Sequence, residues 1–311
     1  MSNHNLIPTT TNNNLQTTAN QILLQAQGTY IAKIRRDQPT ALVFLIDQSG
    51  SMSSGELTMD GIQMSKAQAA ARIVNATLNE LISKATRDGE IRNYIDFAII
   101  GYGAKSHESA LLWSGNLAGK TWVTTQELAE NGTMGNLEKM TKLPDGTTRI
   151  TTKPTKTWFE PVAENLTPMH HALTTTQQLL TQWIANGHQH SPPPVVINIT
   201  DGAATDAKSP QLIAIANQIK QLKTTDGQVL LLNCHLSDTE GESTMFPNDL
   251  HELPNDDYAN CLFEMSSFMP HKYTDDINKA KETTNTQPYK GMCFNADGSR
   301  LIRFITIGSS Y

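Results

Sequence analysis

Two apolar segments that each run into an aspartate restrict the possible folds of this chain more than any other feature. Residues 41–46 (ALVFLI) end at Asp47 in a loop rich in serine and glycine, and residues 195–200 (VVINIT) end at Asp201. Neither segment shows the alternation of apolar and polar residues that marks a strand with one solvent face. Continuous strand-forming segments of this kind are typical of strands that a parallel sheet buries on both faces.

Helical and strand patterns alternate between and after these segments. The expected helices span 62–82, 169–184 and 210–222. The further expected strands span 94–102, 109–113 and 229–235. This order predicts an α/β fold, with a doubly wound, mostly parallel central sheet, helices on both faces and right-handed crossovers. Ligands of such a sheet bind beyond the carboxyl ends of its strands.

Composition suggests three parts in this chain of 311 residues. Residues 1–38 form a polar segment that we expect to be partly disordered, because its Thr and Asn residues offer little apolar surface to offset ordering entropy. A main domain spans 39–236, with an insertion at about 114–161 that could be a hairpin. Residues 237–311 form an extension that we expect to pack on this domain. Its expected elements are helices at 258–268 and 274–283, a turn at 294–298 and a strand at 301–307.

Composition also limits partners and compartment. Acidic residues number 30 against 24 Lys and Arg, giving a net charge of −6, so no overall basic field attracts nucleic acid. The first 20 residues lack the features of a signal peptide, and no segment approaches the roughly 20 apolar residues that span a bilayer. The three cysteines are widely spaced and form neither a disulfide framework nor a zinc knuckle. We expect a cytoplasmic protein without nucleic-acid or membrane partners.

The loop after the first apolar segment carries three oxygen-bearing side chains at alternating positions, Asp47, Ser49 and Ser51. All three can turn toward one point, which suits a hard cation. Asp201 supplies a second carboxylate by the same topology. Mg²⁺ takes about six oxygen ligands and usually keeps several waters, so a site with few carboxylates leaves positions for water or an incoming group. Mn²⁺ and Ca²⁺ accept the same ligands.

The Asp-x-Ser-x-Ser motif at 47–51, with Thr-Asp-Gly at 200–202 downstream, resembles the metal-ion-dependent adhesion site of the von Willebrand factor A family. In that family a threonine ahead of a helix completes the site, and the matching residue is Thr167. The resemblance covers roughly residues 40–236. One departure is Asn165-Leu166, where the family often has glycines, which could alter the loop geometry without removing a ligand.

The resemblance implies binding rather than catalysis. Ser49, Ser51 and Thr167 would be direct or near-direct ligands, whereas Asp47 and Asp201 would act through water and hydrogen bonds. The metal would then recruit an Asp or Glu carboxylate from a protein partner.

The whole chain is also similar to bacterial cytoplasmic A-domain proteins associated with tellurium resistance and stress, which are often encoded beside a protein kinase and a phosphatase. The residues that carry this likeness are 200–206 and 294–297. It implies a scaffold or regulatory subunit in a stress or signalling system, with a kinase, phosphatase or ATPase as partner.

Plainer interpretations remain for several of these residues. Taken alone, the 47–51 motif could be a capped turn into a helix. Asp206 could be an acid that supports the metal ligands, but it is rather expected to cap the helix that starts near residue 209. His170 and His171 are adjacent on a helix and point in different directions, so they should not share a metal. Cys234 should be a buried small apolar residue. Met52 and Met59 could form an exposed contact surface, whereas core packing is expected for Met64.

Three rival functions are open. A haloacid-dehalogenase-like phosphatase would carry a second carboxylate two residues after Asp47, and this position is Ser49. A serine hydrolase would place Ser49 or Ser51 in Gly-x-Ser-x-Gly, which neither occupies. An assembly subunit of an ATPase or kinase complex could hold the metal structurally. Retention of the partner in a chelator would indicate this last function.

Overall fold

The computed structural model describes residues 28–310 except 56, 105–107 and 238–242, so most of the segment expected to be disordered lies outside the described residues. Its centre is one sheet with strand order β13-β14-β12-β11-β1-β6-β7, and β8 also pairs with β6. The mutually parallel strands are β1 (Thr40–Asp47), β6 (Ile95–Tyr102), β11 (Val195–Thr200), β12 (Leu230–Leu236) and β14 (Met292–Ala296). The antiparallel strands are β7 (Ser109–Leu111), β8 (Val123–Thr124) and β13 (Thr244–Met245).

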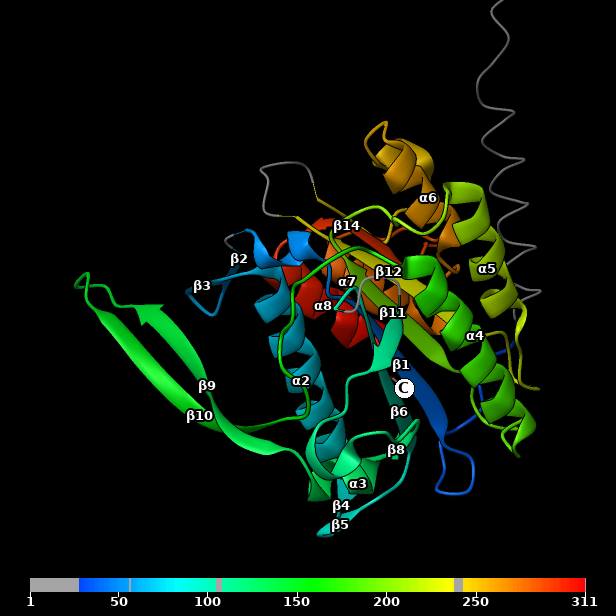
Figure 1. Ribbon diagram of the computed structural model, residues 1–311, viewed down its shortest axis with the longest axis horizontal. Helices are drawn as coiled ribbons and strands as arrows, with labels where there is room; N and C mark the ends of the chain where they lie inside the picture. Colours follow the sequence, from blue (N-terminus) through cyan, green and yellow to red (C-terminus); the bar gives the residue numbers. More distant parts are fainter. Residues whose placement is uncertain (1–27, 56, 105–107, 238–242, 311) are drawn as a thin grey trace, which may run out of the picture.

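Helices cover both faces of this sheet (Figure 1). On one face lie α2 (Lys66–Ala85), α7 (Thr274–Lys281) and α8 (Gly298–Gly308). On the other lie α4 (Met169–Ala185), α5 (Ser209–Gln221) and α6 (Asp257–Met265). Successive residues of β1 enter the two cores in turn, because side chains alternate across a strand. This arrangement confirms the doubly wound, mostly parallel fold and explains why β1 and β11 are largely apolar and buried along their whole length. None of the described helices has the length and apolar character that crossing a bilayer requires.

The first crossover helix starts later than its sequence pattern predicts. Residues 62–64 form β3 (Ile62–Met64), which pairs with β2 (Leu57–Met59) across a turn at Asp60 and Gly61. Gly61 has φ +77°, a conformation that glycine tolerates. Ser65 and Gln68 then form a reciprocal capping box that starts the helix at Lys66. The turn at Asp60 and Gly61 and the capping box at Ser65 therefore set the start of α2, although the helical spacing of apolar residues extends back to residue 62.

Two expectations for the C-terminal stretch are wrong. The expected turn at 294–298 lies largely in strand β14, and the expected strand at 301–307 is helix α8, which Asp297 caps. Leu301, Phe304 and Ile305 are buried while Ile302 is 44% exposed, which is a helical spacing of apolar contacts with the sheet. β14 pairs with β12, so this stretch contributes a strand to the sheet itself.

A long hairpin occupies much of 114–161. It consists of β9 (Thr133–Lys142) and β10 (Thr148–Thr157), follows the short helix α3 (Thr125–Glu130), and projects from the body (Figure 1). Asn79 of α2 binds both backbone groups of Lys156 at its base. A smaller hairpin, β4 (Thr86–Arg87) with β5 (Glu90–Ile91), follows α2.

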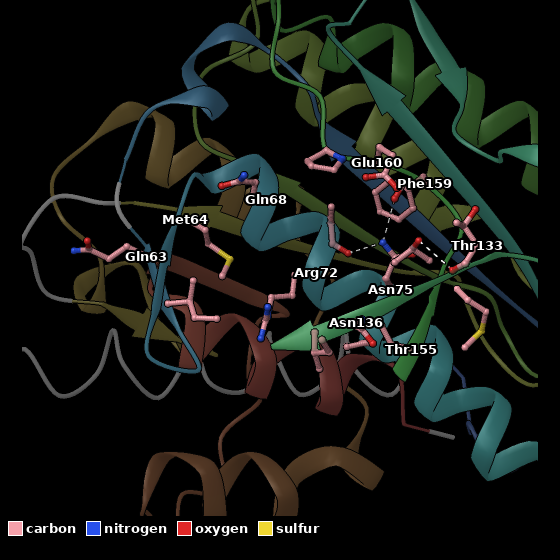
Figure 2. A pocket seen from close by; sticks show the side chains of 18 residues that line it. Gln63, Met64, Gln68, Arg72, Asn75, Thr133, Asn136, Thr155, Phe159 and Glu160 are labelled. Atoms are coloured by element: carbon pink, nitrogen blue, oxygen red, sulfur yellow. Dashed lines mark hydrogen bonds between the residues drawn. The ribbon is translucent and has the colours of Figure 1, made fainter. Parts of the chain in front are cut away.

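A groove of about 560 Å³ lies between the long hairpin and α2 (Figure 2). Buried Asn75 holds its floor, because its amide donates to the Phe159 carbonyl and accepts from Trp158 N. Gln68 and Glu160 line it on the side where α2 begins. The start of α2 and the loop that leads to Thr167 therefore border both the groove and the site described next.

Candidate metal-binding site

The two aspartates meet where the winding of the sheet reverses. β1 and β11 are neighbours, with Ile46 in register with Ile199, so Asp47 and Asp201 both lie at the carboxyl ends of adjacent parallel strands. From this point the chain continues from β1 to α2 on one face and from β11 to α5 on the other. Such a switch point opens a crevice between diverging loops, which is where sheets of this class bind ligands.

Asp47 is fully buried, and both of its carboxylate oxygens accept hydrogen bonds. Oδ1 accepts from Ser49 N at 2.9 Å and Oδ2 accepts from Thr200 Oγ1 at 2.8 Å. Burial, with a smaller contribution from the nearby Asp201 carboxylate, outweighs the lowering effect of these hydrogen bonds and raises the pKa of Asp47 to about 6. Asp47 is therefore a carboxylate whose charge the surrounding protein only partly compensates.

A chain of contacts joins the two serines to the second aspartate. The Ser49 and Ser51 hydroxyl oxygens are 3.1 Å apart, and Ser51 Oγ donates to Asp201 Oδ1 at 2.7 Å. The other oxygen, Asp201 Oδ2, lies 2.9 Å from Lys66 Nζ and accepts no further hydrogen bond from the described residues. The structure thus brings Asp47, Ser49, Ser51 and Asp201 into one cluster.

Thr167 lies in a third loop that is bound to the other two. Its backbone N–H donates to Thr205 Oγ1 at 3.0 Å, and Thr205 N donates back to the Thr167 carbonyl at 2.9 Å. Gly50 N donates to the Asn165 carbonyl at 3.1 Å. Asn165 has φ +24°, so it adopts a positive φ where the family that the motif resembles often has glycines. Thr167 is 6% exposed at the meeting point of the three loops.

The donor set fits a hard divalent cation. The predicted ligands are two carboxylates and three hydroxyls, all of them oxygen donors, which Mg²⁺, Mn²⁺ and Ca²⁺ accept. Ser49 and Ser51 face each other across 3.1 Å, and each could turn a lone pair toward a shared cation. Within the described part of the chain, no group of three or more His, Cys, Asp or Glu side chains is placed to hold a metal ion.

Three residues support the cluster in ways that could not be predicted from the sequence. Lys66 pairs with Asp201 from the first turn of α2, but the β2–β3 hairpin separates it from the motif along the chain. Thr200 was recognised as part of a motif, not as the donor that positions Asp47. Gly103 follows β6 with φ +114°, and a Cβ there would lie 2.6 Å from the Leu166 carbonyl oxygen and 2.7 Å from Ser49 N. The role of Gly103 is evident from its φ and from the atoms packed around it, neither of which the sequence shows.

Asp206 does not cap α5, which begins after Lys208. Its two oxygens instead accept from His170 N and His171 N at the start of α4, so it caps the helix that follows Thr167. His171 Nδ1 lies 3.0 Å from Oγ of Ser109, the first residue of the antiparallel strand β7. Both histidines therefore lie at a helix start. Asp206 caps a helix, as expected, but this helix is α4 and not α5.

The expected exposed methionine surface is wrong. Met52 is fully buried and Met59 is 3% exposed. Gly298, at the start of α8, packs so closely on Met59 that a Cβ there would meet its Cγ at 2.3 Å. The helix that sequence analysis expected to be a strand thus covers this side chain. Met64 is partly buried against the core, and Cys234 is buried and free, as expected.

No family model matches the sequence, and no curated protein matches it. Among solved structures, the chain is similar to a von Willebrand factor type A protein from Catenulispora acidiphila, at 10% identity and a TM-score of 0.35 over 64% of this chain and 34% of that one. It is also similar to the vWF domain of the type V pili tip protein Mfa5 from Porphyromonas gingivalis, at 10% identity and a TM-score of 0.41 over 89% and 95%. The fold class rests on the strand order and helix layers described above.

Replacing Gly103 with Ala should separate the loops. The new Cβ would collide with backbone atoms of two loops at once, so we expect a loss of about 2–4 kcal/mol in the free energy of unfolding. Urea denaturation measures this. Gly146→Ala is the matched control, because Gly146 also has a positive φ, +82°, but nothing lies within 4 Å of its Cβ position; it should lose only about 1 kcal/mol. Equal losses in both variants would contradict the close approach.

At neutral pH, Asp47→Asn should remove the cost of a buried negative charge from the stability of the cation-free protein. The pKa of Asp47 is raised from 3.8 to about 6, so the folded state holds this proton more tightly than the unfolded state. Its contribution to stability is full below the unfolded pKa and is lost as the pH rises through 6. In a chelator, wild type should therefore lose about 2 kcal/mol relative to Asp47→Asn between pH 4 and pH 7. Urea denaturation at both pH values tests this, and a constant difference would refute it.

Proposed function

We propose that this chain is a divalent-cation-dependent protein-binding module of the von Willebrand factor A type, with Mg²⁺ as the cation and Mn²⁺ or Ca²⁺ as alternatives. The observation that supports it best is the hydrogen-bonded series from Ser49 through Ser51 to Asp201 beside buried Asp47. It links hydroxyls and carboxylates from two adjoining strand ends, which is the donor chemistry a hard cation requires.

The residues of this site would have different roles. Ser49, Ser51 and Thr167 would hold the cation through their hydroxyls. Asp47 would position the loop, because both of its oxygens already accept hydrogen bonds from Ser49 N and Thr200. Asp201 would orient Ser51 and balance charge. The bound cation would supply an open coordination position for an Asp or Glu carboxylate of the partner.

Binding is favoured over phosphatase chemistry by the surroundings of Asp47. A nucleophilic aspartate needs a carboxylate oxygen directed at the substrate, whereas both Asp47 oxygens are engaged by the protein. Two residues later, where a phosphatase of the haloacid-dehalogenase kind carries its second carboxylate, stands Ser49. We therefore propose that the chain is not an enzyme.

Specificity would come from the surfaces around the cation. The β9–β10 hairpin projects beside the groove that borders the start of α2 (Figure 1), and its Met134 and Ile150 are 64% and 57% exposed. Exposed apolar side chains on a projecting arm suit contact with a protein. The resemblance at 200–206 and 294–297 supports a cytoplasmic scaffold or regulatory subunit of a bacterial stress or signalling system, with a kinase, phosphatase or ATPase as partner.

Ser51→Ala should weaken cation binding at least tenfold, since it removes a proposed ligand and the hydrogen bond that orients Asp201. Titration calorimetry with Mg²⁺ and Mn²⁺ measures the change. Ser53→Ala is the control, because Ser53 lies in the same loop but donates only to the Gly50 carbonyl. Equal affinity of Ser51→Ala and wild type would exclude this hydroxyl as a ligand.

Partner capture should depend on the cation. Wild type should retain a protein from cell extract in Mg²⁺ and release it in a chelator, and the variant Ser49→Ala should retain little in either, as read by mass spectrometry. Retention that survives the chelator would favour an assembly subunit with a structural metal. Turnover of a generic phosphate ester that Asp47→Ala abolishes would favour the phosphatase instead.

A further inference from the structure

A buried lysine already stands at the candidate cation site. Lys66 Nζ lies 2.9 Å from Asp201 Oδ2, and the side chains of Lys66 and Asp201 are 8% and 0% exposed. An ion pair this deeply withdrawn from water is screened little by solvent. Its ammonium therefore acts directly on the charge of the site.

The local backbone holds this lysine in place without stabilising its charge. Lys66 is the first residue of α2, and the Ser65–Gln68 capping box fixes the helix start. A cation at a helix N-terminus meets the positive end of the helix dipole and is disfavoured there. Asp201 is a compensating partner, and among the described residues Lys66 is the one basic side chain within 4 Å of its carboxylate.

The charges of the site make a second cation a competitor. Asp47 and Asp201 together carry two negative charges, and Lys66 offsets one of them. A divalent cation held by Ser51 would approach the same Asp201 carboxylate, whose Oδ1 accepts from Ser51 and whose Oδ2 faces Lys66. Two cations that share one buried carboxylate repel each other.

We propose that Lys66 is an internal counter-cation that sets the affinity of the site for divalent cations. In the cation-free protein its ammonium neutralises Asp201 and keeps the loops after β1 and β11 together. A divalent cation binds against its repulsion, which lowers the affinity, and the extra positive charge then favours an anionic ligand such as a partner's carboxylate. This inference rests on the proposed function and adds the residue that regulates it.

The test compares Lys66→Met, which keeps most of the aliphatic stem and removes the charge, with wild type and with Lys84→Met. Lys84 lies at the other end of the same helix, where it pairs with Glu80 at the surface. Titration calorimetry with Mg²⁺ and with Mn²⁺ gives the affinity, and thermal unfolding in a chelator gives the stability of the cation-free form. Lys66→Arg keeps the charge and serves if Lys66→Met folds only with a cation present.

Lys66→Met should bind both cations at least tenfold more tightly than wild type. In a chelator its melting temperature should fall, because Asp201 then lacks its counter-charge, and Mg²⁺ should restore it. Lys84→Met should match wild type, and Lys66→Arg should bind the cations no more tightly than wild type. If Lys66→Met binds the cations and wild type does not, this also supports the inference, because the competition by Lys66 is then strong enough to prevent binding.

Two results would count against it and separate it from the proposed function. If wild type and Lys66→Met bind Mg²⁺ and Mn²⁺ with equal affinity, the counter-cation role is overturned while cation binding stands. If neither protein binds a cation in any of these titrations, the proposed function is overturned and the inference falls with it.

Discussion

Burial of two carboxylates at the ends of neighbouring parallel strands is the constraint around which this site is organised. A buried carboxylate is unfavourable unless each oxygen has a partner, and the structure meets this demand from several directions. Asp47 takes a backbone N–H from its own loop and a hydroxyl from β11. Asp201 takes a hydroxyl from the β1 loop and an ammonium from α2. The two strand ends are thereby held together by the groups that also define the candidate site.

Much of the fold could be predicted because its central strands carry an unambiguous signal. The segments at 41–46 and 195–200 are apolar except for Asn198 and Thr200, and the structure buries both faces of each, which confirms the α/β prediction. The pattern failed at 301–307, where a short apolar run fits a strand or a buried helix equally well. Packing against the sheet decided in favour of the helix, and the cap at Asp297 and the spacing of Leu301, Phe304 and Ile305 agree with it.

The candidate site could be predicted only as far as local motifs reach. Asp47, Ser49 and Ser51 lie within one short motif, and Asp201 follows an obvious strand, so their proximity follows from sheet topology. Lys66 and Gly103 could not be identified in this way. The first reaches Asp201 only because a hairpin turns the chain back, and the second matters because two loops pack onto its missing side chain. Both are properties of contacts between segments far apart in sequence.

The position of β14 has a consequence for how the polypeptide acquires its structure. β12 is a buried, strongly apolar strand, and its outer edge pairs with β14, which is formed by residues 292–296. Until those residues leave the ribosome, the nascent chain presents an unpaired apolar edge that can pair with another molecule. At synthesis rates of about 5–20 residues per second, the roughly 55 residues between β12 and β14 leave this edge uncovered for seconds. Completion of the sheet is thus a late event, and the uncovered edge is open to aggregation during that interval.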